Sequence, residues 1–112
     1  MITPSYRYHC NITKVYDGDT VTADIDLGFE VWLKGVRVRL KGINTPELRG
    51  DERPQGLESR DRLKDLLAIT PITIESSGKG KYGRWIGTLW NGTGLNCNEA
   101  LVEDGFAEYR EY

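Results

Sequence analysis

The sequence contains few cysteines and no long apolar segment. Its two cysteines, Cys10 and Cys97, are too few for a disulfide framework, so we expect two reduced thiols and no disulfide partner. No apolar stretch approaches the roughly 20 residues that a transmembrane helix needs. Residues 1–6 lack a basic stretch followed by an apolar core, so no signal peptide is expected. These absences predict an intracellular protein, either cytoplasmic or phage-encoded, with no membrane partner. We also expect a monomer, although the sequence does not itself give the oligomeric state.

Charge is unevenly distributed along the chain. The 112 residues carry a net charge of −2, which by itself argues against a nucleic-acid partner. Residues 34–84, however, contain twelve Lys or Arg and seven Asp or Glu (+5), whereas the remaining residues contain three and ten (−7). The basic central block favours a polyanionic ligand, although mixed charge can also simply solvate a surface. A chain this short forms one domain, which we place at residues 1–112.

The apolar pattern predicts five strands. These strands cover residues 8–15, 20–25, 29–40, 72–75 and 85–90. Each is an alternating or β-branched run, and the third should break near Lys34–Gly35 at a bulge or bend. Past that break, Arg37, Arg39 and Lys41 share the polar face. Residues 42–53 and 76–81 are expected to be loops.

Two helices complete the prediction. The first should begin at or after Pro54, bury Leu63, Leu66 and Leu67, and end before Pro71. The second should cover residues 100–104, with Asn96 as N-cap, Glu99 as its capping-box partner and Gly105 as the C-terminal stop. One helix between strands three and four and one after strand five fit a mainly β fold, a five-stranded OB-type barrel.

Asp17-Gly18-Asp19 lies between the first two strands. An Asp-Gly pair usually indicates only a tight hairpin turn. The second aspartate places two carboxylates within a few ångströms, where they repel each other unless a cation lies nearby. Hard divalent cations such as Ca²⁺ prefer several oxygen ligands of this kind.

Thr45-Pro46-Glu47 follows the third strand. Pro46 restricts its own backbone and that of Thr45, so the loop can aim one carbonyl and one carboxylate. Asn44 adds a side-chain oxygen. An ordinary surface turn is the alternative interpretation of this segment.

Arg39 and Arg84 are candidates for phosphate binding. A guanidinium donates two parallel hydrogen bonds to phosphate and stays charged. Lys79 and Lys81 precede Arg84 on a glycine-bearing loop that a polyanion can approach. Three tyrosines are candidates for stacking on bases: Tyr82, Tyr109 and Tyr112. Each of these residues is also compatible with an ordinary surface role.

Five motifs in this order resemble the staphylococcal nuclease (thermonuclease) family. They are Val15–Thr20 (VYDGDT), Val38–Glu47 (VRLKGINTPE), Pro54–Ser59 (PQGLES), Lys81–Arg84 (KYGR) and Asn98–Ala107 (NEALVEDGFA). The resemblance covers roughly residues 8–110, nearly the whole chain. It implies a five-stranded OB-fold barrel of the nuclease type. It also implies a Ca²⁺-dependent nuclease that cuts DNA and RNA to leave 3′-phosphates and 5′-hydroxyls.

The resemblance also implies roles for individual residues. Asp19, Asn44 and the Thr45 carbonyl would be Ca²⁺ ligands, with Asp17 in the outer shell. Glu47 would orient or deprotonate the attacking water. Arg39 and Arg84 would hold the phosphate. Lys81 and Tyr82 would bind an adjacent phosphate of the substrate, and Lys79 joins them as a substrate-binding residue.

Two departures from the family pattern change these expectations. Asn44 stands where the best-known members have Asp, so we expect weaker Ca²⁺ binding, and Mg²⁺ or another divalent ion becomes an alternative. The chain ends at Tyr112, where longer relatives continue with a further helix. The acidic segment near this end should discourage nucleic acid on that side; it includes Glu103, Asp104, Glu108 and Glu111.

Two other functions compete with the nuclease hypothesis. One is a non-catalytic module of the same family that binds nucleic acid or protein, and the other is a purely structural OB-like domain. Degenerate modules lose the arginines or the metal carboxylates, whereas Asp19, Arg39, Glu47 and Arg84 are all present here. The sequence therefore favours an enzyme.

Overall fold

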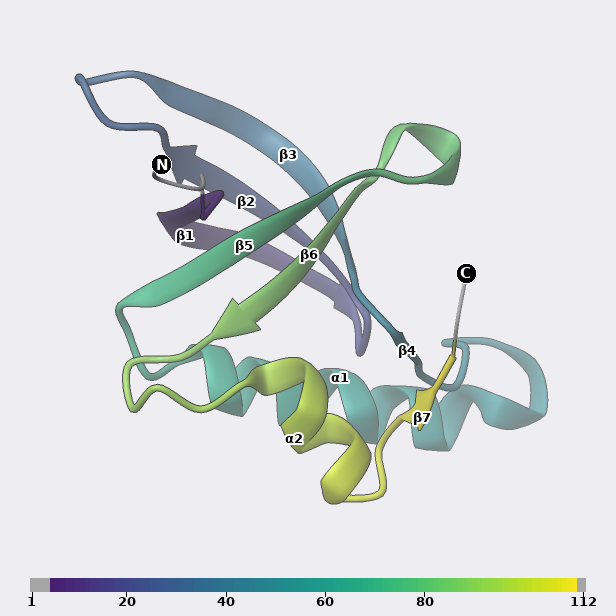
Figure 1. The fold of residues 1–112 in the computed structure, drawn as a ribbon. Helices are drawn as coiled ribbons and strands as arrows, with labels where there is room; N and C mark the ends of the chain where they lie inside the picture. Colours follow the sequence, from purple (N-terminus) through teal and green to yellow (C-terminus); the bar gives the residue numbers. More distant parts are fainter. Residues whose placement is uncertain (1–4, 111–112) are drawn as a thin grey trace.

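Five strands close into a small barrel (Figure 1). The computed structural model describes residues 5–110. The strand order around the barrel is β1-β2-β3-β6-β5, and all neighbours are antiparallel except β3 and β6. The strands are β1 (Arg7–Asp17), β2 (Thr20–Asp26), β3 (Trp32–Leu40), β5 (Ile72–Lys79) and β6 (Trp85–Trp90). The predicted OB-type barrel is confirmed.

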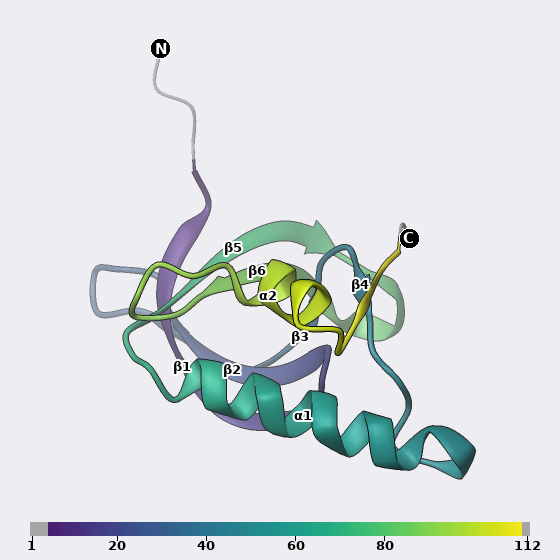
Figure 2. The same ribbon diagram turned by 90° about the horizontal axis from the view of Figure 1, so that it is seen from below.

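Two helices cover one end of the barrel. Figure 2, viewed from below, shows α1 (Arg53–Leu67) running beside β1 and α2 (Cys97–Glu103) lying over the barrel opening. The buried side chains of Leu63, Leu66 and Leu67 turn from α1 into the core, as the helical spacing predicts. Among residues 5–110, neither helix is long and apolar enough to cross a membrane.

The ends of α2 follow from local side-chain chemistry. The Asn96 side chain accepts a hydrogen bond from the backbone N–H of Glu99 (3.1 Å), which satisfies a donor that the first turn leaves open. Gly105 follows the helix with a φ of +83°, a conformation that glycine adopts without strain. Both predicted caps are confirmed. The helix itself begins at Cys97, three residues earlier than predicted.

The loop after β3 contains structure that the sequence did not indicate. Ile43–Asn44 forms the short strand β4, which pairs antiparallel with β7 (Glu108–Tyr109) near the end of the chain. Two residues are too few to produce a periodic pattern, so β4 and β7 were missed. A single 3₁₀ turn, η1 (Gly50–Glu52), lies between β4 and α1, and a second, η2 (Lys81–Gly83), lies between β5 and β6. The β4–β7 pair fixes the chain immediately before the Thr45-Pro46-Glu47 segment.

Two strand boundaries differ from the prediction by more than two residues: the start of the third strand and the end of the fourth. The third strand begins at Trp32 rather than near Phe29, because Phe29 and Glu30 adopt positive φ values in the turn that follows Gly28. The predicted break near Lys34–Gly35 is a bulge. Ala23 pairs with Val36 but Ile25 pairs with Leu33, so β3 holds one extra residue there. Residues 76–79, predicted as loop, continue β5 and pair with β6. Their polar side chains are compatible with a strand because this part of β5 is partly exposed to solvent.

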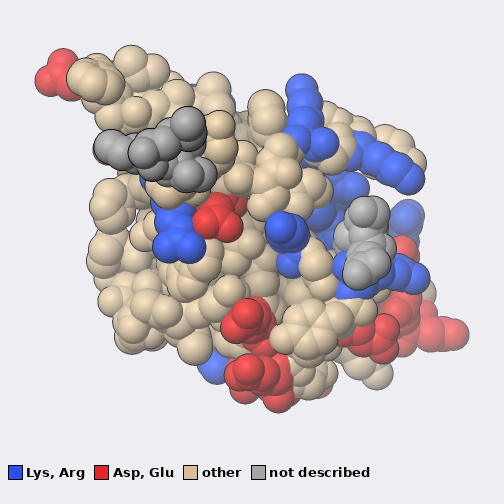
Figure 3. Space-filling model, in the orientation of Figure 1, with Lys and Arg blue, Asp and Glu red and all other residues tan. Residues whose placement is uncertain are grey.

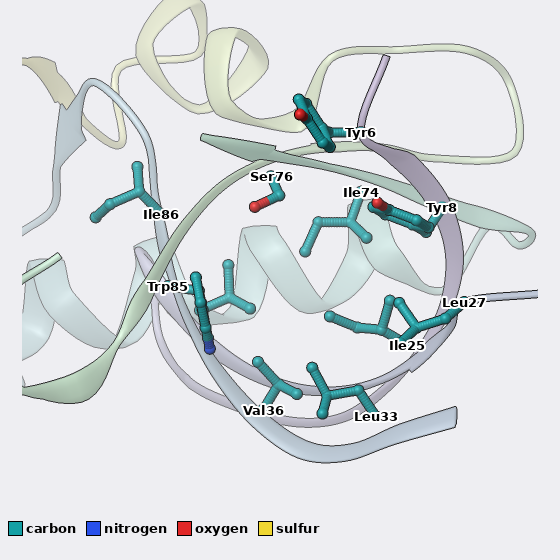
Figure 4. A pocket seen from close by; sticks show the side chains of 11 residues that line it. Tyr6, Tyr8, Ile25, Leu27, Leu33, Val36, Ile74, Ser76, Trp85 and Ile86 are labelled. Carbon is teal, nitrogen blue, oxygen red and sulfur yellow. The ribbon is translucent and has the colours of Figure 1, made fainter. Parts of the chain in front are cut away.

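The other end of the barrel is hollow and apolar. A pocket of about 160 Å³ lies here. Figure 4 shows that aliphatic side chains such as Ile25, Leu33 and Val36 line it, with Tyr8 and Trp85 at its edge. None of the predicted site residues lines this pocket. The candidate site therefore lies away from the hollow end of the barrel.

Candidate active site

The two aspartates lie at the β1–β2 hairpin. Gly18 and Asp19 form the turn between the paired residues Asp17 and Thr20. Asp17 Oδ1 accepts a hydrogen bond from the Asp19 backbone N–H (3.0 Å). A Cβ atom on Gly18 would lie 2.8 Å from both Ser59 Cβ and Thr45 Cγ2. Glycine therefore lets the turn pack directly against α1 and the Thr45 loop.

Asp19 connects three segments that are separate in sequence. Its Oδ2 lies 2.6 Å from Nη1 of Arg39, and both residues are buried. The same Oδ2 accepts a hydrogen bond from the Thr45 backbone N–H (3.0 Å). Arg39 Nη2 in turn donates to Asn44 Oδ1 (3.3 Å). One carboxylate thus holds together the β1–β2 turn, the end of β3 and the loop after β4.

Arg39 is buried, although the alternating pattern of the third strand places it on the polar face. Its exposed fraction is 8%, while Arg37 and Lys41 on the same polar side are exposed. The alternation of β3 could not reveal this burial, because the loop carrying Asn44 and Thr45 covers the polar face. Burial and the Asp19 carboxylate orient the guanidinium before any ligand arrives.

The Asp17 carboxyl lies in a crowded, partly buried position. Burial raises its pKa to about 6, and the hydrogen bond with Asp19 and the negative charge of Asp19 act in the same direction. The backbone N–H of Asp19 and the Arg39 guanidinium oppose the rise. The Asp17 carboxyl therefore keeps its proton to a higher pH than an exposed aspartate does, while the Asp19 carboxylate pairs with the Arg39 guanidinium.

Glu47 lies beside Asp17 on an open hollow. Its side chain is 63% exposed and pairs with Arg49 Nε at 3.3 Å. The hollow, about 270 Å³, is lined by Tyr16, Asp17, Glu47, Leu48 and Arg49. Tyr16, Leu48 and Arg49 were not among the predicted site residues. Tyr16 lies within the VYDGDT motif and Leu48 and Arg49 directly follow Glu47, so their positions in sequence were the only signal.

Gly56 holds the Glu47 segment against α1. A Cβ at this position would overlap the carbonyl group of Glu47 and lie 2.9 Å from the Pro46 carbonyl oxygen. The first turn of α1 therefore packs directly against the Pro46–Glu47 backbone. This packing, together with the ring of Pro46, limits where the Glu47 carboxylate can lie.

The third group of predicted residues lies on the β5–β6 connection. The parallel register places Arg39 beside Ile86 of β6, so Arg84 lies two residues upstream of Ile86, immediately before β6 begins. The Arg84 guanidinium lies 5.8 Å from the Tyr82 ring centroid, and its Nε is buried without a hydrogen-bond partner in the described chain. Within residues 5–110, no hydrogen bond or ion pair joins Lys79, Lys81 or Arg84 to the aspartates.

Charge is unevenly distributed over the face of the molecule shown in Figure 3. Figure 3 shows Lys and Arg side chains gathered where the β5–β6 connection lies, and many Asp and Glu side chains lower in the view, over the helices. Tyr109 is 66% exposed on β7 and lines a groove with Lys41 and Arg110. Glu111 and Tyr112, also singled out from the sequence, lie outside the described residues.

Comparison with known proteins identifies the family. Residues 37–112 match the family described as "Staphylococcal nuclease homologue", which is more than half of the chain. An "Uncharacterized endonuclease" of Escherichia coli O157:H7 is 33% identical over 105 residues, covering 93% of this chain and 63% of the relative. The chain belongs to the staphylococcal nuclease family.

More distant family relatives are larger proteins. Endonuclease YhcR of Bacillus subtilis (strain 168) is 30% identical over 108 residues, covering 90% of this chain and 9% of the relative. The "Probable staphylococcal-like nuclease CAN3" of Oryza sativa subsp. japonica is 29% identical over 75 residues, covering 67% and 18%. Even against the Escherichia coli relative, the chain spans less than two thirds of the length.

Members of the staphylococcal nuclease family generally use divalent cations, so the oxygen donors must be tested against such an ion. The described residues contain no group of three or more His, Cys, Asp or Glu side chains arranged to hold a metal. Two carboxylates lie close together at Asp17 and Asp19, with the Asn44 side-chain oxygen linked to them through Arg39. This donor set fits a hard cation that retains several water ligands.

Proposed function

We propose that this chain is a divalent-cation-dependent nuclease domain that hydrolyses phosphodiester bonds in DNA, RNA or both. The observation that carries the proposal is the junction at Asp19, where the aspartate turn, buried Arg39 and the loop leading to Glu47 meet. Family membership and the endonuclease names of the relatives support the same class of activity. Because the chain spans only part of these relatives, the activity of the whole protein is part of this proposal.

Individual residues of the chain would have separate roles in hydrolysis. Glu47 would accept a proton from the attacking water, whose oxygen forms the new bond to phosphorus as the bond to the 5′-oxygen breaks. The departing 5′-oxygen would take a proton from solvent, so this cleavage would leave a 3′-phosphate and a 5′-hydroxyl. Arg39 and Arg84 would stabilise the charge that develops on the non-bridging oxygens, since preorganised donors act most strongly on the transition state. Lys79, Lys81 and Tyr82 would bind a neighbouring part of the substrate.

Asp19, Asn44 and the Thr45 carbonyl would hold the cation, with Asp17 in its outer shell. We propose Ca²⁺, with Mg²⁺ or another divalent ion as an alternative because Asn44 contributes no charge. A bound cation would supply charge neutralisation at the reacting phosphate. The raised pKa of Asp17 and the crowding of the two aspartates are the features of this chain that support added positive charge.

A non-catalytic nucleic-acid- or protein-binding module is the alternative function. Arg84→Ala separates the two, because the half-buried Arg84 makes no ion pair in the described chain and its loss should leave the fold intact. Losing one donor to the developing charge should lower kcat on a labelled oligonucleotide about 10²–10³-fold. Lys34→Ala, which removes an exposed cation on β3, is the matched control. Equal kcat for both variants would remove Arg84 from the mechanism.

A further inference from the structure

A second groove lies between β1 and α1. It encloses about 640 Å³, and its walls carry the basic side chains of Lys14, Arg53, Arg60 and Lys64. Tyr16 and Leu48 line both this groove and the hollow that holds Asp17 and Glu47. The groove is therefore continuous with the candidate active site, on the side formed by β1 and α1 rather than by the β5–β6 connection.

Helix α1 presents three of its four basic residues along one line, while Arg62 lies on the opposite side and pairs with Asp104. Arg53, Arg60 and Lys64 are spaced by seven and four residues, which places them one above another on a helix of 3.6 residues per turn. The same spacing gathers Glu58, Asp61 and Asp65 on a different side, about 100° around the helix. The helix thus separates its charges and turns the basic line toward the groove beside β1.

The two lysines of this groove, like Arg53, form no ion pair with a carboxylate among residues 5–110. Within residues 5–110, neither Lys14 nor Lys64 has a carboxylate oxygen within 4.0 Å, and both are exposed. Lys14 Nζ instead lies 5.6 Å from the ring centroid of Tyr16, which is 51% exposed. The groove thus combines uncompensated positive charge with an accessible aromatic ring.

The remaining basic residues are held in position by local contacts. Arg53 Nη1 donates to the Leu48 carbonyl oxygen (2.8 Å), which ties the groove to the loop that follows Glu47. Among the described residues, the carboxylate paired with Arg60 is that of its neighbour Asp61, whose side chain is 62% exposed, so solvent screens that pair. Both guanidinium groups keep N–H donors available to an anion, because each has five.

We propose that this groove binds the sugar–phosphate backbone of single-stranded nucleic acid beyond the cleaved bond, with Tyr16 stacking on an unpaired base. The inference rests on the proposed function, since it extends a substrate out of the hollow at Glu47. Regularly spaced cations neutralise successive phosphates, and exposed aromatic rings bind unpaired bases of any sequence. An acidic protein surface would use the charges but would leave the exposed ring of Tyr16 without a stacking partner.

The salt dependence of binding tests the inference without requiring hydrolysis. Affinity for a fluorescein-labelled hexadecathymidylate is measured by anisotropy in chelator over a range of salt concentrations. Each lost phosphate contact lowers the slope of log K against log salt by about 0.7, so Lys14→Gln/Lys64→Gln should lower it by about 1.4. The affinity should fall at least about tenfold at moderate salt. Lys34→Gln, an exposed lysine outside the groove, should leave the slope unchanged.

Cleavage of the same oligonucleotide with divalent cation separates this inference from the proposed function. Binding that weakens as predicted in a protein that never cleaves would contradict the nuclease and support the groove. Cleavage with an unchanged slope in the folded double variant would support the nuclease and overturn the groove. Wild-type protein that binds anionic phospholipid vesicles but no oligonucleotide would also overturn the assignment to nucleic acid.

Discussion

The Asp19 carboxylate lies 2.6 Å from the Arg39 guanidinium, and the two side chains are only 9% and 10% exposed. The pair joins the β1–β2 turn to the end of β3, the two strand ends on which the candidate site depends. A buried ion pair stabilises little relative to apolar residues, but removing one partner leaves the other charge buried and uncompensated. The pair therefore positions Arg39, and removing either partner should lower the stability of the fold.

Asp19→Ala should lower the free energy of unfolding by about 3–5 kcal/mol, because Arg39 would remain buried without its carboxylate. Urea denaturation measures this change. The control is Arg7→Ala, which breaks the Arg7–Glu75 pair on the surface, where Arg7 is 56% exposed. That variant should lose no more than about 1 kcal/mol. Equal losses for the two variants would contradict the structural role of the Asp19–Arg39 pair.

Gly56→Ala should lower both stability and activity, although alanine is normally the better helix former by about 1 kcal/mol. The added Cβ would overlap the Glu47 carbonyl and push the loop away from α1. Gln55→Ala, at an exposed position of the same helix, should leave both properties near wild type. Thermal unfolding and kcat on an oligonucleotide are the two measurements. Unchanged kcat in the Gly56 variant would show that the position of Glu47 does not depend on this packing.

The strands and caps that the sequence predicts are those that depend on local pattern. β6 matches its predicted bounds because an alternating run ends at an Asn-Gly turn, and the Asn96 cap needs only a neighbour three residues on. Burial of Arg39 and the pairing of β4 with β7 depend on segments far apart in the chain. The motifs identify Asp17, Asp19, Arg39 and Asn44 as candidates, but only the fold shows which of them contact each other.

Asn44→Asp should tighten binding of a divalent cation on the order of tenfold, since the charge of the ligands tunes affinity at oxygen sites. Asn44 Oδ1 already faces Arg39 Nη2, so a carboxylate at this position would lie within the same network. Isothermal titration calorimetry with Ca²⁺ and with Mg²⁺ measures the change. Identical affinities for the variant and wild type would remove Asn44 from the set of metal ligands.

Asp17→Asn should stabilise the metal-free protein near neutral pH. The pKa of Asp17 in the folded protein, about 6, is higher than the usual 3.8, so the folded state prefers the protonated carboxyl. This contribution is fully present below about pH 4 and is lost as the pH rises through about 6. After allowance for solvent screening, the D17N variant should gain about 1 kcal/mol over wild type at about pH 7 and nothing at about pH 4.

Thermal unfolding in chelator at the two pH values measures this difference. Thr20→Ser, in the same turn, keeps the charge of Asp17 and serves as the control for general effects at the site. A stability difference between D17N and wild type that is the same at both pH values would contradict the raised pKa of Asp17.

If Glu47 and a divalent cation act together to cleave nucleic acid, plasmid digestion should depend on both of them. Wild-type protein should cleave the plasmid with Ca²⁺ or Mg²⁺ and lose this activity in excess chelator. Because Glu47 is 63% exposed, Glu47→Gln should fold normally yet lose cleavage by at least about 10²-fold. Cleavage that persists unchanged in chelator, or in the folded Glu47→Gln variant, would contradict the account.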